Sequence, residues 1–332
     1  MGGYLPNYRI EVDGSNATAK FNAYLLSVKV TLTAGGKSDS CEIEMHNPDG
    51  RMALPRKGAI IEIYLGYGDD GNLVSQGRYE VEENAGKWGP SDTLTITGKA
   101  AGKKSLKESK TRAWNGKTIG QMVTKIAGEH GYEPAVGADI GAILLTDEAQ
   151  SEESDQHFLH RIAKKYGGLF SVKDDRMVMI KRGGGKTASG KAMPAMTFTR
   201  DNTIGGSWTL KPRAEYGKVK ATYQDRPSAT RKEVEISDGD GPAHTIRMPH
   251  ATEAEAKAAA EAKKGDLKRG EGSITINVEG DETLQPEGTA IVTGIDAGAN
   301  GTWSVKTIEQ SMTFTGGENS GFSSAITGEK GK

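Results

Sequence analysis

Apolar and polar residues alternate through the first hundred positions, which is the pattern of β-strands that bury one face. The alternation is clear at positions 8–12, 26–32, 41–45, 61–65, 79–81 and 94–96. Turn-forming residues such as Pro48-Asp49-Gly50 separate these stretches. We therefore expect residues 1–102 to form a first antiparallel domain, a small barrel or sandwich of six strands.

The period changes to that of a helix after residue 103. Thr118 and Gln121 have the spacing of a capping box, and Gly131 is placed to end the helix. The apolar positions between them form one stripe: Ile119, Met122, Val123, Ile126 and Ala127. We expect a helix with one buried face.

Residues 151–180 predict a second helix followed by a β-hairpin. Ser154 can cap the helix, and Gly167 can take the left-handed conformation that stops it. The stripe of this helix consists of Phe158, Leu159, Ile162, Ala163 and Tyr166. Alternation at 169–172 and 177–180 then predicts two strands. Residues 103–195 should form a small α/β linking domain, ending in the polar connector 183–191.

The pattern of strands returns in residues 196–332. Strands are expected near 217–223, 273–278, 289–293, 303–308 and 323–327. One helix, at about 252–268, is capped by Thr252 with Glu255, and its stripe is mostly alanine. We expect it on the outside of this second β domain. Two β blocks of similar size flank the α/β block, which suggests a duplicated barrel, although the two sequences do not align by eye.

Composition narrows the classes of function. The chain has 332 residues, 45 of them glycine, and its 43 basic and 44 acidic residues give a net charge of −1. No global field would draw it to nucleic acid or to an anionic membrane. Its apolar runs are shorter than a spanning helix requires, and its first residues do not resemble a signal peptide. The single cysteine, Cys41, excludes an intrachain disulfide and is expected in the core.

Histidine and carboxylate residues on the second helix are the best candidates for a metal site. His157 and His160 share a face, with Asp155 and Glu153 nearby. No third ligand follows at motif spacing, and the pattern is not that of a zinc protease. We interpret both histidines as partly solvated neighbours of the apolar stripe.

Other motifs also favour structural interpretations. Gly183 to Thr187 resembles the end of a phosphate loop, but Ile180 stands where the first glycine is required. The acidic pairs 152–153 and 174–175 lie at a helix start and in a turn, where acids are common. The lysine-rich segment 99–110 lacks interleaved aromatics, which favours a solvated linker over a nucleic-acid contact. We assign no catalytic, cofactor-binding or metal-binding residue.

Four blocks together are similar to the late control protein D family, the tail hub proteins of contractile-tail phages. They are RMALPRKG (51–58) leading into IIEIYLGYG, GRYEV (77–81) with the strand TLTITGKAA, WNGKTIGQMVTKIAGEHGY with SDQHFLHRIAKKYGG, and Gly280-Asp281 with LQPEG and GTWSV. They span nearly the whole chain in order. One departure is Gln310, near a position where many relatives have histidine.

The resemblance implies a non-enzymatic hub related to the bases of VgrG-type spikes. Each subunit would carry two β-barrel tube domains joined by the linking domain. A homotrimer would then form a pseudo-sixfold ring that adapts the tail tube to a threefold central spike. Implied partners are the tail tube protein, the spike protein, other baseplate proteins and the tape measure protein, with no nucleic acid, membrane insertion or cofactor. The implied location is the virion baseplate, after assembly in the host cytoplasm.

Within this interpretation we expect eight residues to have structural roles. Pro55 and Gly58 would fix the turn before the strand at 60–68. Trp303, after Gly301, would anchor the second barrel core. Phe158, Leu159 and Ile162 would pack the linking domain ahead of the stop at Gly167.

Two other functions remain open from sequence. GKTIGQMVTKIAGEHG has a faint likeness to peptidoglycan-binding helices, so a peptidoglycan-binding or cell-wall-degrading tail component is the alternative, although no block is left over for a lytic domain. A transcription regulator would need a DNA-binding motif, and none is recognisable.

Overall fold

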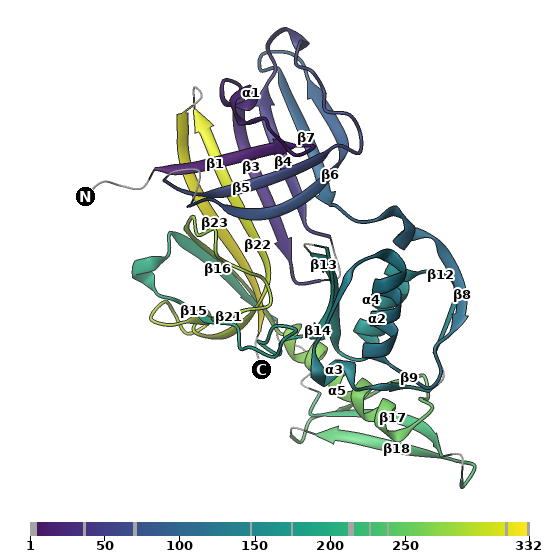
Figure 1. The fold of residues 1–332 in the computed structure, drawn as a ribbon. Coiled ribbons are helices and arrows are strands. Elements are labelled where there is room, and N and C mark those ends of the chain that lie inside the picture. Colours follow the sequence, from purple (N-terminus) through teal and green to yellow (C-terminus); the bar gives the residue numbers. More distant parts are fainter. Residues whose placement is uncertain are drawn as a thin grey trace.

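The structure is a computed structural model that describes residues 5–35, 38–68, 72–146, 148–173, 175–211, 216–225, 227–237, 239–315 and 318–330. The protein is mainly β. Figure 1 shows a first β unit at the top, a second β unit at the lower left, an α/β domain at the right, and a helix on a small sheet at the bottom. None of the helices in the described ranges is long and apolar enough to cross a membrane.

The first β unit contains the six expected strands. Its elements are β1 (Pro6–Val12), β2 (Ser15–Asn16), α1 (Thr18–Asn22), β3 (Leu25–Thr33), β4 (Ser40–His46), the 3-10 turn η1 (Pro48–Gly50), β5 (Ile60–Tyr67), β6 (Val74–Lys87) and β7 (Thr93–Ala100). One inward position differs from the simple alternation, because Leu25 rather than Leu26 is buried. A register shift between Leu25 and Ser27 in the pairing of β3 with β4 accounts for it.

The linking domain has its own sheet and core. Its elements are η3 (Lys104–Lys107), β8 (Ser109–Ala113), β9 (Lys117–Thr118), α2 (Ile119–His130), β10 (Glu133–Val136), α3 (Ala138–Gly141), β11 (Leu144–Leu145), β12 (Ala149–Ser154), α4 (Asp155–Lys165), β13 (Gly168–Lys173) and β14 (Arg176–Lys181). The apolar faces of α2 and α4 form one buried cluster with side chains of β13 and β14. This cluster is separate from the core of the β units.

The predicted helix ends in this domain are confirmed. The Thr118 hydroxyl accepts from Gln121 N at 3.2 Å, and the Gln121 side chain accepts from Thr118 N at 3.0 Å. Ser154 Oγ accepts from His157 N at 3.3 Å. Gly131 and Gly167 adopt left-handed φ values of 63° and 68° after the two helices.

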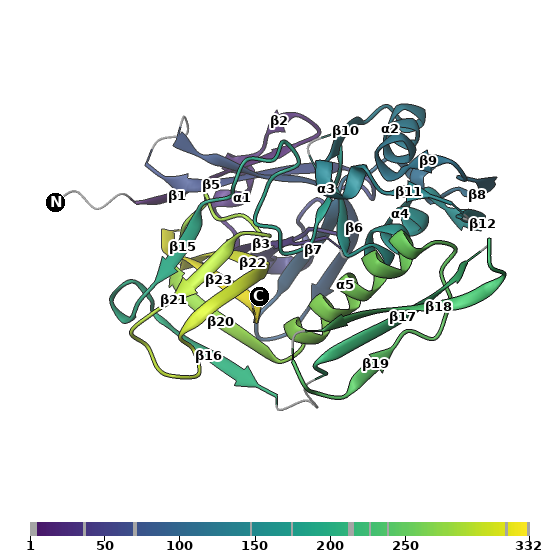
Figure 2. The ribbon, with the colours of Figure 1, turned by 90° about the horizontal axis from the view of Figure 1, so that it is seen from below.

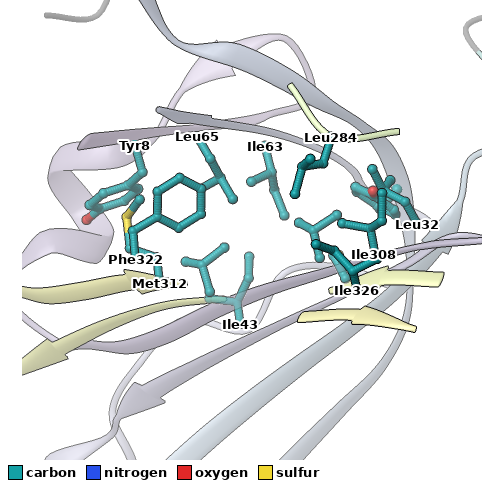
Figure 3. Packing of buried hydrophobic residues seen from close by; sticks show 14 of the residues in the cluster. Tyr8, Leu32, Ile43, Ile63, Leu65, Leu284, Ile308, Met312, Phe322 and Ile326 are labelled. Carbon is teal, nitrogen blue, oxygen red and sulfur yellow. The ribbon is translucent and has the colours of Figure 1, made fainter. Parts of the chain in front are cut away.

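The second β unit continues the sheet of the first. It contains β15 (Ala195–Phe198), η4 (Arg200–Asn202), β16 (Gly205–Leu210), β20 (Gly272–Glu279), β21 (Thr289–Val292), β22 (Gly301–Thr315) and β23 (Glu318–Lys330). Strand β22 pairs antiparallel with β3, so that both units belong to one 13-stranded sheet. The two units also share one core, in which Leu32 and Ile63 pack near Leu284 and Ile308 (Figure 3).

The strand order of the first unit is repeated in the second. The first unit runs β3-β4-β7-β6-β5-β1, and the second runs β16-β20-β23-β22-β21-β15. The duplication suggested by the two β blocks is therefore present as topology. Among the described residues the pairings leave this sheet open at its ends, so neither unit is closed into a barrel by strand pairing alone.

One expectation for residues 196–332 was wrong. The strand at 217–223 and the alanine-rich helix do not belong to the second β sheet. Strands β17 (Lys218–Asp225), β18 (Thr230–Ser237) and β19 (Ala243–Thr245) form a separate sheet that is covered by α5 (Glu253–Arg269), as Figure 2 shows. Ala256 and Ala260 are fully buried against Val219 and Ala221. Small side chains let the helix lie close to the sheet, so the alanine stripe is a packing surface rather than an outer face.

Candidate assembly surface

Strand β16 is the outer strand of the large sheet and is exposed along its whole length. Among the described strands it pairs only with β20. Three large apolar side chains lie on or beside it: Ile204 is 71% exposed, Trp208 43% and Leu210 40%. Apolar side chains together with unpaired backbone on an ordered strand are features of a protein contact surface.

The Trp208 ring is held in place. Its Nε1 donates to Asp296 Oδ2 at 3.0 Å. The ring also lies directly against Gly298, where an added Cβ would come within 2.3 Å of it. The indole is thus fixed on one side while much of it remains in water, so a partner would not have to order it.

The backbone of β16 offers hydrogen bonds to a neighbour. Lys211 N donates to Glu271 O at 2.8 Å, which marks the hydrogen-bonded positions on the β20 side. Because these positions alternate in antiparallel pairs, the backbone groups of Gly206, Trp208 and Leu210 point away from β20. These N–H and C=O groups can form hydrogen bonds with another strand.

A second open edge lies at the far end of β6. The first half of β6 pairs with β5, and its second half pairs with β7 alone among the described strands. Glu83, Ala85, Gly86 and Lys87 are exposed there. Trp88 follows in the turn and is 91% exposed. The sheet therefore has an uncovered tryptophan at each of two open edges.

The residues assigned structural roles from sequence lie as follows. Phe158, Leu159 and Ile162 are fully buried in the linking domain. Trp303 is 1% exposed, and its Nε1 donates to Ala299 O at 2.8 Å. Gly301, at the start of β22, has a φ of 132°.

The turn before β5 involves the other two of these residues. The Pro55 carbonyl accepts from Asn84 Nδ2 at 2.9 Å. Gly58 adopts a φ of 82°, and its N–H donates to Val81 O at 2.9 Å. A residue other than glycine would be strained at that φ.

His157 and His160 do not form a site together. His157 is largely exposed and lies 2.9 Å from Glu153. His160 packs edge-on against Phe170, with ring centroids 4.9 Å apart. Burial, together with the neighbouring His157, lowers the pKa of His160. Both side chains are neighbours of the apolar stripe.

A buried charge cluster around Asp155 was not found from sequence. Lys110 Nζ donates to Oδ2 at 2.6 Å, and Gln150 Nε2 donates to Oδ1 at 2.8 Å. His130 Nε2 also lies 2.8 Å from Oδ2, and Arg112 pairs with Oδ1. Burial alone would raise the pKa of Asp155, but the hydrogen bonds from His130, Lys110 and Gln150 and the charge of Arg112 outweigh it and lower this pKa to about 2.

The cluster has the outline of a metal site but the chemistry of an ion-pair network. Glu129, His130 and Asp155 place three possible ligand atoms within 4.8 Å of one another. Both Glu129 oxygens lie 2.8 Å from Arg112, and Lys110 bonds both carboxylates. A cation would have to displace two side-chain cations, so the donor set does not fit a metal.

This cluster also changes the interpretation of the lysine-rich segment. Lys103 donates to His130 O at 2.6 Å and to Gly131 O at 2.8 Å, which closes the C-terminus of α2. With Lys110 in the cluster, residues 99–110 are not simply a solvated linker. No spacing rule joins Lys110 and Arg112 on β8 to the ends of two helices, so only the fold could bring them together.

The remaining sequence candidates have no chemical partners around them that suggest a reaction. Cys41 is buried, and burial raises the pKa of its thiol to about 12. Gly183 to Thr187 form turns after β14, where Thr187 N bonds Lys191 O, and no helix follows. Of the acidic pair in the β13–β14 turn, Asp174 lies outside the described residues, and Asp175 forms an exposed ion pair with Arg78.

Comparison with known proteins gives the same assignment from several directions. Residues 73–315 match the family model described as phage tail baseplate hub (GPD). The chain is 32% identical over 219 residues to the probable baseplate hub protein of Escherichia phage P2, covering 66% of this chain and 56% of that protein. It is 28% identical over 275 residues to the probable baseplate hub protein of Escherichia phage 186, covering 80% and 70%. The chain thus spans little more than half the length of its P2 relative.

A solved structure supports the fold over the whole chain. The 43 kDa tail protein of prophage MuSo2 from Shewanella oneidensis superposes with a TM-score of 0.72 at 15% identity, covering 97% of this chain and 98% of that one. At this identity the likeness establishes the fold alone.

Proposed function

The chain belongs to the phage tail baseplate hub family, and we propose that three copies of it form the central ring of a contractile-tail baseplate. In this ring the chain adapts a sixfold tail tube to a threefold spike. Its location is the baseplate of a phage or phage-tail-like particle, after assembly in the host cytoplasm. Its role is structural rather than enzymatic.

One observation carries the proposal, which is the repeated strand order. Each chain contains two units of the same topology on one continuous sheet. Three copies in a ring then present six such units, which offers a sixfold tube an equivalent contact on every subunit. The same three copies present three linking domains, which suits a threefold spike.

The open edges support a ring rather than a free subunit. One edge is the end strand β16 and the other is the far half of β6, which β5 leaves unpaired, and each has an exposed tryptophan on or beside it. Stable assemblies bury about 800 Å² per partner or more, with aromatic residues near the centre of the contact. A ring of copies would cover both edges, whereas a single copy leaves both in water.

The proposed partners are those that such a ring would contact. We propose that the tail tube protein contacts one end of the ring and that the central spike protein contacts the other, with further baseplate proteins and the tape measure protein around them. Ser105 Oγ lies 2.7 Å from His130 Nδ1, and His130 Nε2 lies 2.8 Å from Asp155 Oδ2, so a hydroxyl, an imidazole and a carboxylate are linked in series. Lys110 and Arg112 pair with the same carboxylate, which favours a structural network over a catalytic one.

Native mass spectrometry of the purified chain tests the ring. We expect a trimer, and we expect co-purification with the tube and spike proteins encoded beside it. A species that stays monomeric at high concentration and binds neither protein would contradict the proposal.

Incubation with peptidoglycan tests the alternative function. The helix with a faint likeness to peptidoglycan-binding sequences is α2, and its apolar face is buried in the linking domain. We therefore expect neither cleavage nor pelleting. Either result would favour a cell-wall function instead.

A further inference from the structure

The two β units correspond residue by residue at their centres. Tyr79 pairs with Ala100 at the start of β6–β7 contact, and Trp303 pairs with Lys330 at the same point of β22–β23. The next pairs are Val81 with Gly98 and Val305 with Gly328. In each unit a Cβ on that glycine would press on the preceding aromatic side chain, Tyr79 or Trp303, at 3.1–3.2 Å.

The irregularities of the strands correspond as well. Each pairing has a register shift, between Val81 and Glu83 in the first unit and between Val305 and Thr307 in the second. In the first unit Val81 N donates to Ala59 O at 2.9 Å, and in the second Val305 N donates to Gly288 O at 3.0 Å. A bulge at the same place is a specific feature of a strand, so it fixes the correspondence without ambiguity.

Within one chain the two units are joined by strand pairing. Residues Thr307 to Thr313 of β22 pair antiparallel with β3, with Thr307 opposite Thr33 and Met312 opposite Val28. By the correspondence, β22 is the counterpart of β6. Strand β16 is the counterpart of β3. Cys41 and Ile274 correspond because they pair with Gly98 and Gly328. Cys41 pairs in turn with Val30 of β3, and Ile274 with Trp208 of β16. The junction thus has a second, unfilled copy, made of β16 and the far half of β6.

Exposure differs between the filled and unfilled positions. Val28, Val30 and Leu32 on β3 are 0–5% exposed beneath β22. Their counterparts on β16 are Gly206, Trp208 and Leu210, which are all exposed. These three positions face the core side of the sheet, but no described strand lies beside them as β22 lies beside β3.

We propose that β16 of one copy pairs antiparallel with residues 83–88 of a neighbouring copy, in the register of the β3–β22 junction. This inference rests on the ring proposed above. The transferred register places Lys211 opposite Glu83, Thr209 opposite Ala85 and Ser207 opposite Lys87. On the core-facing side it places Leu210 opposite Asn84, Trp208 opposite Gly86 and Gly206 opposite Trp88.

The side chains that meet in this register are complementary. Lys211 and Glu83 are exposed residues of opposite charge. Each tryptophan meets a glycine of the other strand, so neither ring is blocked by a side chain directly across from it. Gly206 cannot carry a side chain of its own, because a Cβ there would lie 2.3 Å from Thr275 O. The register comes from backbone pairing alone, so the match in charge and size of the side chains supports it independently.

Each partner brings one tryptophan to the contact. Trp88, at 91% exposed, can bury most of the roughly 150–250 Å² of a tryptophan and Trp208, at 43% exposed, less than half of it, toward the roughly 800 Å² that each partner needs. Three copies then contain six equivalent junctions, three within chains and three between them. This is a head-to-tail contact, which closes into a ring when each junction turns the chain by one sixth of a circle.

Cysteine cross-linking of the full chain tests the register. Thr209→Cys combined with Ala85→Cys places the two thiols on directly opposed residues of neighbouring copies. Cys41 is buried and stays in place. On mild oxidation we expect covalent dimers and trimers in non-reducing gels, and neither single variant should give covalent trimers.

A shifted pair is the matched control. Ser207→Cys with Ala85→Cys displaces one thiol by two residues, about 7 Å along the strand, which is too far for a disulfide, so cross-linking should be about tenfold slower or worse. If native mass spectrometry shows trimers but the matched pair cross-links no faster than the shifted pair, the register is wrong while the ring stands. If no trimer forms from the unmodified chain, the ring itself is wrong.

Discussion

Strands β16 and β18 each end a sheet and are exposed along most of their length, yet they differ in charge. Strand β18 contains Arg231, Lys232, Glu233 and Glu235 among its eight residues. Strand β16 has the sequence GGSWTL and contains no charged residue. Charged residues on an edge strand keep other strands from pairing with it.

The ion pairs on the small sheet strengthen this contrast. Glu233 and Glu235 lie 2.7 Å and 3.6 Å from Lys220 and Lys218 of β17, and Lys232 lies 2.6 Å from Asp225. Strand β18 is therefore an edge that is protected in water. Strand β16 has no charged residue to keep other strands away. Its Trp208 is exposed at a position where the corresponding residue of the paired strand β3, Val30, is buried. The difference supports the proposal that another copy covers β16.

Trp208→Lys should have the largest effect, because it gives β16 the protection that β18 already has. A charge at a core-facing interface position should weaken the association of copies by about a thousandfold. Sedimentation velocity over a range of concentrations measures this. The matched control is Thr230→Lys at the exposed start of β18, which should leave the trimer intact. A Trp208→Lys variant that remains trimeric at wild-type concentrations would remove the distinction between the two edges.

Asp155→Asn should weaken the fold without opening an edge. Removing the carboxylate leaves Lys110 and Arg112 without their buried partner, which should cost about 3 kcal/mol of unfolding free energy. Urea unfolding should be measured in the Trp208→Lys background, where unfolding is not coupled to dissociation. In the otherwise unchanged chain, Asp155→Asn should still give trimers. Loss of the trimer there would show that the cluster serves assembly as well.

The pH dependence of the same cluster follows from its lowered pKa. Asp155 titrates at about 2 in the folded chain and near 3.9 when unfolded, so its stabilising effect is complete above about pH 4 and is lost as the pH falls toward 2. Acid titration of the unfolding free energy should show this loss in the parent chain. The Asp155→Asn variant should lack this part of the curve.

The contrast between edges also shows what the sequence could and could not predict. Period and capping rules predicted the strands of the first unit, the ends of α2 and α4, and the burial of Phe158. These features depend on residues a few positions apart. Strand β16 was not predicted, because glycine-rich GGSWTL has no alternation of apolar and polar residues. The sequence shows that this segment is uncharged. Only the strand order shows that it lies at the edge of the sheet, where the absence of charge matters.

The charge cluster and the separate small sheet were not predicted from the sequence, for a related reason. Asp155 was noted only as a neighbour of His157, whereas its partners come from β8, α2 and β12. The strand at 217–223 reads like any other strand, and its assignment to the wrong sheet came from its position in the sequence. Long-range pairing decides both features, and no short spacing encodes it.

Charge reversal across the proposed junction should have a smaller effect. Lys211→Glu or Glu83→Lys alone should weaken the trimer by up to about tenfold, since a rim ion pair contributes about 1 kcal/mol or less. The double variant should recover most of the loss. Both effects should shrink at high salt because the pair lies in water. A double variant weaker than both single variants would place the two residues apart and so contradict the register.

Glu233→Gln on β18 should have the smallest effect and tests the other half of the comparison. Its carboxylate lies 2.7 Å from Lys220 Nζ, but both side chains are well exposed, so water and salt already screen the pair. We expect urea unfolding and the trimer mass to match those of the parent chain. The reason is that protection of an edge comes from the several charges along β18 rather than from one ion pair. If this single change caused β18 to associate with other copies, one ion pair rather than the whole charge pattern of the strand would keep β18 unpaired. The absence of charge on β16 would then not distinguish the two edges.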